Sequence, residues 1–353
     1  MAAIEVLLIS LVLILVACSL FTNAVEWLGR RLRVNPAVVG SVFAAVGTAM
    51  PETAIPIVAI LVYGDAQAVD VGLGAVAGAP FMLATLAFCV TGAAVLAFTK
   101  LGRRELAMNA DPRLVVRDLA WFLALYGAAI AVSFVQDMPW LRYAVAAGLV
   151  VAYTLYVYRT FAGRDAAGLE QTSLEDLTFA RYLRRPNRDH KPGHKPDPAP
   201  LGPPGLPLIL LQLAVALAAI IFGAHRFVGA TEAVAAFNGI APLLLSIIII
   251  PIATELPEKF NSILWIARRK DTLALGNITG AMVFQTCVPV AFAIAFTPWH
   301  LTGLTLASAL IALGTGLAGL LWIKIAGRVN PYALLAAGLG YAAFFVYVFV
   351  ART

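Results

Sequence analysis

Three glutamates of this chain stand inside apolar segments, where a carboxylate has few structural uses. Glu52 ends residues 36–52 (PAVVGSVFAAVGTAMPE), and Glu258 ends residues 242–258 (PLLLSIIIIPIATELPE). Glu255 lies three residues before Glu258, and therefore on nearly the same face of a helix. A carboxylate at membrane depth is costly, so it usually faces a cavity or a partner. The chemistry these residues could perform is cation binding or proton transfer.

The two segments that carry these glutamates repeat each other at a constant offset of 206 residues. Four residues of the first segment recur in the second, namely Pro36, Thr48, Pro51 and Glu52 as Pro242, Thr254, Pro257 and Glu258. The segments that follow also match, since residues 72–79 read GLGAVAGA and residues 274–281 read ALGNITGA. The chain therefore contains an internal repeat.

Each copy of the repeat combines a broken helix with a closely packed one. Proline cannot donate the helical hydrogen bond, so it kinks the helix and frees a carbonyl one turn earlier. Freed carbonyls at membrane depth are tolerated where they line a cavity, and there they can coordinate a cation. The Gly-x-x-x-Gly spacing lets the following helix approach closely. Two such units, each with one glutamate, predict a cation site between the repeats.

Glu255 has two interpretations. Lys259 follows it at i+4, in the order that favours a helical ion pair, so the two residues could form a neutral structural pair. Alternatively, Glu255 adds negative charge beside Glu258 for a divalent cation. Two carboxylates this close readily share a proton, which suits proton exchange.

The elements that position these residues are membrane helices. The chain has 353 residues, of which 61% are hydrophobic and 12% are charged, with a mean hydropathy of +0.88. Soluble domains are about 25% charged, so this composition excludes a soluble enzyme and a disordered chain. Ten apolar segments are long enough to span a bilayer, near 3–22, 36–62, 69–98, 115–135, 140–161, 206–229, 240–266, 272–296, 299–323 and 330–350.

The basic residues lie mainly in alternate loops. Of the 25 lysines and arginines, 21 fall in the loops after the odd-numbered segments, and only Arg142, Arg226 and Arg352 fall on the other side. This distribution predicts cytoplasmic odd-to-even loops, with both termini outside, in the plasma or inner membrane. It does not indicate nucleic-acid binding, because the basic residues form no single face.

The polar stretch between the fifth and sixth segments divides the chain in two. We predict a first five-helix repeat in residues 1–161, a cytoplasmic Pro- and charge-rich linker in 162–205, and a second five-helix repeat in 206–353. Halves with an odd number of helices insert in opposite orientations, so the repeat is inverted. The predicted fold class is an all-α membrane protein with ten transmembrane helices in two inverted five-helix repeats. Its partners are the lipid bilayer and transported cations.

These motifs resemble those of the sodium/calcium exchanger superfamily, the cation/calcium antiporters. The Gly-Thr-Ser-hydrophobic-Pro-Glu motif of that family is similar to residues 47–52 (GTAMPE) and 253–258 (ATELPE). Its second motif, Gly-Asn-x-x-Gly-Ser-Asn-x-x-Asn or Asp, is similar to residues 74–83 (GAVAGAPFML) and 276–285 (GNITGAMVFQ). The inverted repeat with a central linker fits as well, so the resemblance covers nearly the whole chain.

The resemblance implies a cation site with named ligands. Glu52 and Glu258 would be the central Ca2+ ligands, and Thr48 and Thr254 would add backbone or hydroxyl oxygens. Gln285 stands at a position where the family has an Asn or Asp ligand, although its amide could instead make a packing hydrogen bond between helices.

The departures from the family motifs bear on the coupling ion. Leu83 replaces the Asn or Asp ligand of the first repeat, and Glu255 replaces a serine of the second. Neutral oxygen ligands are thus depleted while carboxylates are kept, which favours coupling to H+ over coupling to Na+.

The resulting hypothesis is a secondary antiporter that exchanges Ca2+, or a related cation, for H+ or Na+ by alternating access. It is not an enzyme and needs no cofactor besides the transported cations. A divergent exchanger for another cation is an alternative, motivated by Leu83. A non-transporting membrane scaffold or sensor that keeps the fold is a second alternative.

Overall fold

The described part of the chain is helical throughout. The computed structural model describes residues 2–31, 50–135, 137–162, 177–179 and 204–352, and it contains no strand within these ranges. Thr48 and the rest of the segment that precedes Met50 lie outside the described residues.

The helices follow the apolar segments of the sequence. In the first half they are α1 (Ala2–Arg31), α4 (Met50–Val58), the π-helical segment η2 (Ala59–Tyr63), α5 (Ala66–Met82), the π-helical segment η3 (Leu83–Ala87), α6 (Phe88–Lys100), α7 (Pro112–Val132) and α8 (Pro139–Ala162). In the second half they are α10 (Leu206–Asn238), α11 (Pro242–Thr254), α12 (Leu256–Ala267), α13 (Asp271–Phe296), α14 (Gly303–Ala326), α15 (Pro331–Ala336) and α16 (Gly338–Arg352).

Eight helical stretches of the described chain are long and apolar enough to cross a membrane. Two shorter apolar helices, Met50–Tyr63 and Pro242–Thr254, fall in the segments that carry the repeated Pro-Glu motifs. Hydrophobic side chains are exposed on many of the helices, as expected where lipid covers them. The chain is therefore a multi-pass membrane protein.

Several helix boundaries differ from those expected. The first helix continues to Arg31 and α10 to Asn238, because no helix-breaking residue interrupts either segment. The expected break in the segment near 240–266 falls at Glu255, which departs from helical geometry and separates two helices. The segment near 330–350 is also divided, at Ala337.

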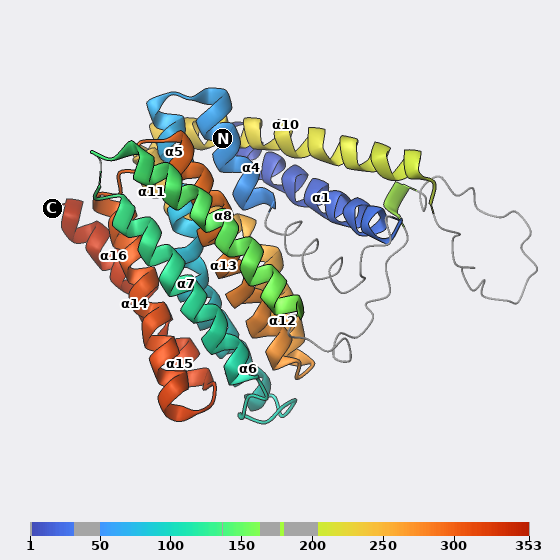
Figure 1. The fold of residues 1–353 in the computed structure, drawn as a ribbon, viewed down its shortest axis with the longest axis vertical. Helices are drawn as coiled ribbons and strands as arrows, with labels where there is room; N and C mark the ends of the chain where they lie inside the picture. The colour runs from blue at the N-terminus through green and yellow to red at the C-terminus, as the bar shows by residue number, and fades with distance from the viewer. Residues whose placement is uncertain (1, 32–49, 136, 163–176, 180–203, 353) are drawn as a thin grey trace, which may run out of the picture.

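Two long helices are set apart from the others. Figure 1 shows α1 and α10 side by side, running across the direction of α7 and α14, while the remaining helices gather in a bundle. Packing between α1 and α10 is close at Gly223, where an added Cβ would lie 2.8 Å from Ile14 Cγ1. The largest buried cluster of the bundle is centred on α13, which contacts α5, α7 and α8.

The glycines of the first repeat let α5 lie directly against α11. A Cβ added to Gly74 would lie 1.8 Å from Ser246 Oγ, and one added to Gly78 would lie 2.5 Å from the carbonyl oxygen of Ile247. The close approach expected from the Gly-x-x-x-Gly spacing is therefore present here. At Gly280 in the second repeat, the nearest atom to an added Cβ among the described residues would be Tyr156 Oη, 4.0 Å away.

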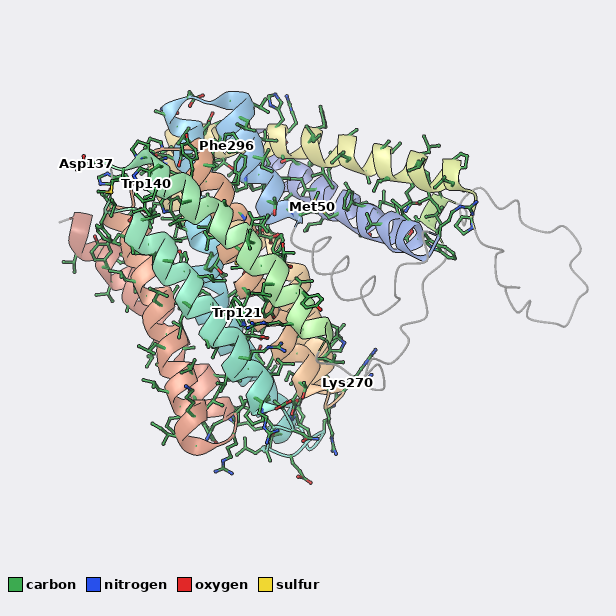
Figure 2. The ribbon with its side chains drawn as sticks, in the orientation of Figure 1. Met50, Trp121, Asp137, Trp140, Lys270 and Phe296 are labelled. Carbon is green, nitrogen blue, oxygen red and sulfur yellow. The ribbon has the colours of Figure 1, made fainter. Side chains whose placement is uncertain are left out.

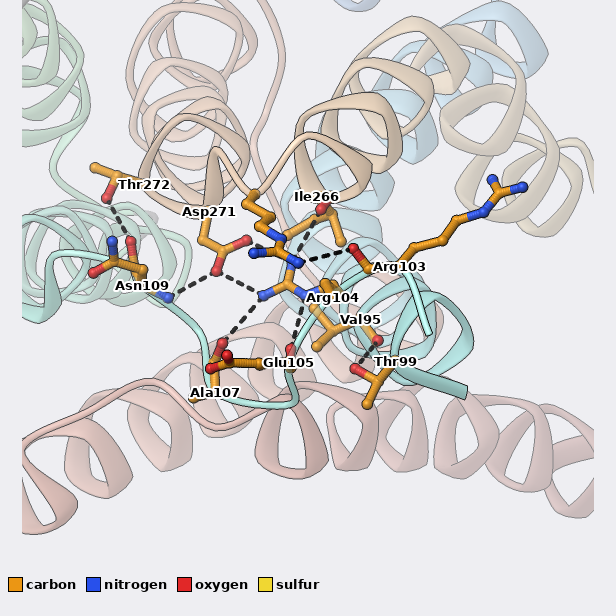
Figure 3. Close-up of polar contacts among 11 residues, drawn as sticks. Val95, Thr99, Arg103, Arg104, Glu105, Ala107, Asn109, Ile266, Asp271 and Thr272 are labelled. Carbon is orange, nitrogen blue, oxygen red and sulfur yellow. Dashed lines mark hydrogen bonds and ion pairs between the residues drawn. The ribbon is translucent and has the colours of Figure 1, made fainter. Parts of the chain in front are cut away.

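A buried ion pair fixes the corner between α12 and α13. Arg104, in the loop after α6, donates from Nη1 to Asp271 Oδ1 at 2.7 Å and from Nη2 to Oδ2 at 2.8 Å (Figure 3). The same guanidinium donates to the carbonyls of Glu105, Ala107 and Ile266. Such a bidentate, fully bonded arrangement holds the start of α13 to the loop.

A second buried carboxylate fixes the middle of α13. Asp118 on α7 accepts from Thr279 Oγ1 at 2.8 Å, from Tyr156 Oη at 3.1 Å and from the Arg117 guanidinium at 2.8 Å. The helix is thereby bonded to α7 directly and to α8 through Tyr156, so the residues that follow Thr279 are held in place.

Candidate functional site

Glu52 lies at the start of α4, on the border between the α1–α10 pair and the bundle. Figure 2 places Met50, the first residue of α4, at this border, and α4 contacts α10, α5 and α13. Pro51 suits the first turn of a helix, and a carboxylate there is favoured by the helix dipole. The side chain of Glu52 is only 3% exposed.

Glu255 lies at the break between α11 and α12. Pro251 interrupts the hydrogen bonds of α11, and Pro257 stands in the first turn of α12, where it has no amide to donate. Glu255 joins the two helices with φ −88° and ψ 8°, and its amide donates to the carbonyl of Pro251 at 3.2 Å. Its side chain is completely buried. The proline-dependent break predicted from the second repeat is therefore confirmed.

The structure brings Glu52, Glu255 and Gln285 into one buried cluster. Glu255 interacts electrostatically with Glu52, and its carboxylate lies within reach of the Gln285 amide on α13. Both carboxylate oxygens of Glu52, Glu255 Oε1 and Gln285 Oε1 are buried and accept no hydrogen bond from the residues that the structure describes. Buried oxygens are almost always satisfied, so four such oxygens in one place mark this cluster as the candidate site for a cation or a proton.

Thr254 adds a hydroxyl oxygen to this cluster. Its side chain lies beside the Glu52 carboxylate, while its hydroxyl donates to the carbonyl of Ile250 at 3.0 Å. A hydroxyl has one proton and two lone pairs. Since the proton is already used, the oxygen can offer a lone pair to a cation next to Glu52.

Lys259 is the positive charge of the cluster. Its Nζ donates to Glu255 Oε2 at 3.2 Å and to the carbonyl of Pro251 at 3.5 Å, and the residue is 8% exposed. It also acts electrostatically on Glu52. The i, i+4 contact between Lys259 and Glu255 agrees with the sequence. The electrostatic interaction of Lys259 with Glu52 on α4 could not be predicted from it.

Two prolines outside the repeated motifs free the backbone carbonyls of two site residues. Pro56 stands four residues after Glu52, and Pro289 stands four residues after Gln285, each inside its helix. A proline has no amide to bond the carbonyl four residues earlier, so the backbone oxygens of both site residues lose their usual donor. An i, i+4 pairing of a polar residue with proline is the sequence signal that could have found them.

Two expected site residues, Glu258 and Thr48, are not described at the level of their side chains. Glu258 belongs to the first turn of α12, but its side chain is not among those described, and Thr48 is outside the described residues. Leu83, at the family ligand position, begins the π-helical segment η3 and packs in the main apolar core. In the described part of the chain, no group of three His, Cys, Asp or Glu side chains has metal-binding spacing.

The cluster offers hard oxygen donors. Carboxylate, amide, hydroxyl and carbonyl oxygens suit Ca2+ and alkali cations, whereas Zn2+ and Cu2+ prefer His and Cys. The two described carboxylates and Lys259 leave one net negative charge among them. The arrangement can therefore hold a cation at membrane depth, between α4, α13 and the broken helices.

Together, the membrane-spanning helices and the buried oxygens between broken helices define the class of multi-pass membrane proteins with a buried polar cluster in the membrane-spanning part. The sequence matches the family described as "Sodium/calcium exchanger protein" over residues 3–162 and 208–351. The chain belongs to the sodium/calcium exchanger family, whose members are transporters rather than enzymes.

Known proteins similar to this chain agree with the family. Inner membrane protein YrbG of Escherichia coli (strain K12) is 23% identical over 296 residues, which are 84% of this chain and 80% of that protein. The crystal structure of the H+/Ca2+ exchanger CAX aligns with a TM-score of 0.68 at 16% identity, covering 99% of this chain and 86% of that chain. The sodium-calcium exchanger NCX_Mj aligns with a TM-score of 0.56 at 16% identity, over 98% of both chains. At these identities the two structural similarities concern the fold.

Proposed function

We propose that this chain is a secondary antiporter that exchanges Ca2+ for H+ across the inner membrane by alternating access. The observation that supports the proposal is the cluster of buried oxygens of Glu52, Glu255 and Gln285 that lack hydrogen-bond donors among the described residues. Ca2+ takes about 6–8 oxygen ligands in flexible geometry. Side-chain oxygens, the carbonyls freed by Pro56 and Pro289, and water can provide them.

Exchange follows when two ions compete for the same carboxylates. We propose that Glu258 shares this site, so the three glutamates and Lys259 carry two net negative charges when all are ionised. A bound Ca2+ neutralises this charge, and two protons on the same carboxylates do so equally well. Either form lowers the cost of moving charge through the apolar interior, whereas the empty, ionised site carries the full cost. The chain therefore changes conformation with one ion or the other bound. H+ is favoured over Na+ as the coupling ion because Leu83 removes a neutral oxygen ligand and Glu255 adds a carboxylate.

The architecture that we propose has ten transmembrane helices in two inverted five-helix repeats, with both termini outside. Its support is the repeated Pro-Glu motif and the sorting of basic residues between loops. Figure 2 labels Lys270 at one end of the bundle and Asp137, Trp140 and Phe296 at the other, as this topology requires. The α1–α10 pair is the moving group in this proposal, because it is set apart from the bundle beside Glu52.

Transport by purified protein in proteoliposomes tests the proposal. We expect Ca2+ uptake driven by an outward H+ gradient, and we expect Glu52→Gln to reduce it at least about tenfold by removing a charge at the site. Glu5→Gln, the same change at an exposed position of α1, is the matched control and should transport normally. Uptake that follows a Na+ gradient and ignores a pH gradient would refute the proton coupling. Full transport by Glu52→Gln would refute the site.

A further inference from the structure

Lys259 divides the oxygen cluster into an occupied half and an open half. Its ammonium contacts Glu255 Oε2 and the carbonyl of Pro251. On the other side of the same carboxylate, Glu255 Oε1 accepts no hydrogen bond from the described residues, and neither do the Glu52 oxygens or Gln285 Oε1. One oxygen of the Glu255 carboxylate thus contacts the Lys259 ammonium. The other oxygen lies among oxygens that have no hydrogen-bond donor in the described part of the chain.

The contacts of this ammonium are those that a bound monovalent cation would make. A carboxylate oxygen and a backbone carbonyl at a helix break are typical ligands of Na+ in broken-helix transporters. The carbonyl of Pro251 already accepts the amide of Glu255, and the lysine bonds to it in addition. The lysine stem reaches this position from the first turn of α12, so the charge is held there covalently and cannot leave.

We propose that Lys259 is a tethered cation that fills one of two adjacent cation subsites. The transported ion then has only the second subsite, formed by Glu52, Glu255 Oε1 and Gln285. The proposal rests on the proposed function for this open half, whereas the half filled by Lys259 can be tested without any transport. Its consequence is that removal of the ammonium opens a subsite for a monovalent cation.

The test uses the full chain in detergent, with Lys259→Met to keep the apolar stem and Lys259→Arg to keep the charge. Equilibrium binding of radioactive Na+, at ionic strength held constant with choline, counts the ions bound per chain. We expect Lys259→Met to bind about one Na+ more than the wild type, since its only lost group is a single positive charge. We expect Lys259→Arg to match the wild type. Methylammonium, a free analogue of the lost group, should displace the additional Na+ from Lys259→Met.

If Lys259→Met is unstable, its recovery by added cations and the behaviour of a second variant still decide the test. Recovery of its fold by Na+ or methylammonium, but not by choline, would support the proposal, because binding to the folded state stabilises it. If neither cation recovers it while Glu255→Gln/Lys259→Met folds, the lysine and glutamate form a purely structural pair and the proposal is wrong. Equal Na+ stoichiometry in the wild type and Lys259→Met would also overturn it.

These outcomes are distinct from those of the proposed function. If the wild type fails to transport Ca2+ but Lys259→Met gains a Na+ ion, the proposed function fails and the tethered cation remains. If Glu52→Gln abolishes transport but the Na+ stoichiometry of Lys259→Met is unchanged, only the tethered cation fails.

Discussion

Arg104 connects three parts of the chain through one buried guanidinium. Its hydrogen bonds reach the loop that follows it, the end of α12 and the carboxylate of Asp271 at the start of α13 (Figure 3). Every nitrogen of the side chain donates, so a lysine, which offers a single charged point, could not replace it. The position of α13, and with it of Gln285, depends on this residue.

We therefore expect Arg104→Met to lower the free energy of unfolding by about 3–5 kcal/mol, because it leaves the buried Asp271 without its partner. Arg104→Met/Asp271→Leu should recover much of this loss, since an apolar pair replaces the ion pair. Thermal unfolding of the detergent-solubilised proteins measures both effects. Equal stability of Arg104→Met and the wild type would show that the pair contributes nothing.

The sequence indicates individual site residues more readily than it indicates which residues contact each other. Glu52 and Glu255 could be found because a charge inside an apolar segment is conspicuous. Arg104 could not be matched with Asp271, since the two lie 167 residues apart and nothing local relates them. Lys259 could be matched with Glu255 on its own helix turn, but its action on Glu52 depends on how α4 packs against α11 and α13.

The contact between α5 and α11 leaves no room for a side chain at Gly78. An added Cβ at Gly78 meets the backbone oxygen of Ile247 at 2.5 Å and Pro251 Cγ at 2.8 Å. Backbone atoms cannot rotate away as a flexible side chain can, so α11 would have to move. Because Pro251 begins the break that carries Glu255, such a movement would displace the site.

We expect Gly78→Ala to destabilise the protein by about 1–3 kcal/mol, as overpacking does, and to weaken cation binding. Gly148→Ala is the matched control, since Gly148 is an exposed glycine of α8 whose added Cβ would meet no described atom within 4 Å. Unfolding temperature and Ca2+ binding of the two variants provide the comparison. An identical response at both glycines would contradict the steric role of Gly78.

Prolines made the helix breaks predictable, whereas other departures from regular helix were not. The break between α11 and α12 falls between Pro251 and Pro257, as the repeat indicated. The π-helical segments η2 and η3 each begin three residues after a proline inside the preceding helix, Pro56 and Pro80, but the repeat did not indicate them. The repeat also suggested equal glycine contacts in both halves, but the segment that would cover Gly280 by symmetry lies outside the described residues.

The orientation of the whole molecule can be tested with single cysteines. In a variant lacking Cys18, Cys89 and Cys287, we expect Asp137→Cys to react with a membrane-impermeant maleimide on intact cells. Arg268→Cys, equally exposed but on a predicted cytoplasmic loop, should react only after lysis. The opposite labelling pattern would show that the orientation in the membrane is the reverse of the predicted one.

The overall class was accessible from composition and charge alone. A low charged fraction gave the membrane environment, and basic residues in alternate loops gave a topology. The separate position of α1 and α10 was not accessible, because neither hydropathy nor loop charge states which helices lie next to each other. It follows from side-chain packing, such as Gly223 against Ile14, which only the structure shows.

Because α1 and α10 are long, we expect bilayer thickness to affect how this pair lies in the membrane. With 30 and 33 residues, these helices are about 45 and 50 Å long, against about 30 Å for the hydrocarbon core. The pair must therefore incline steeply or project beyond the lipid tails, and each ångström of mismatch has a free-energy cost. Since the pair borders Glu52, we expect a thinner or thicker membrane to shift the conformational equilibrium that we propose for transport.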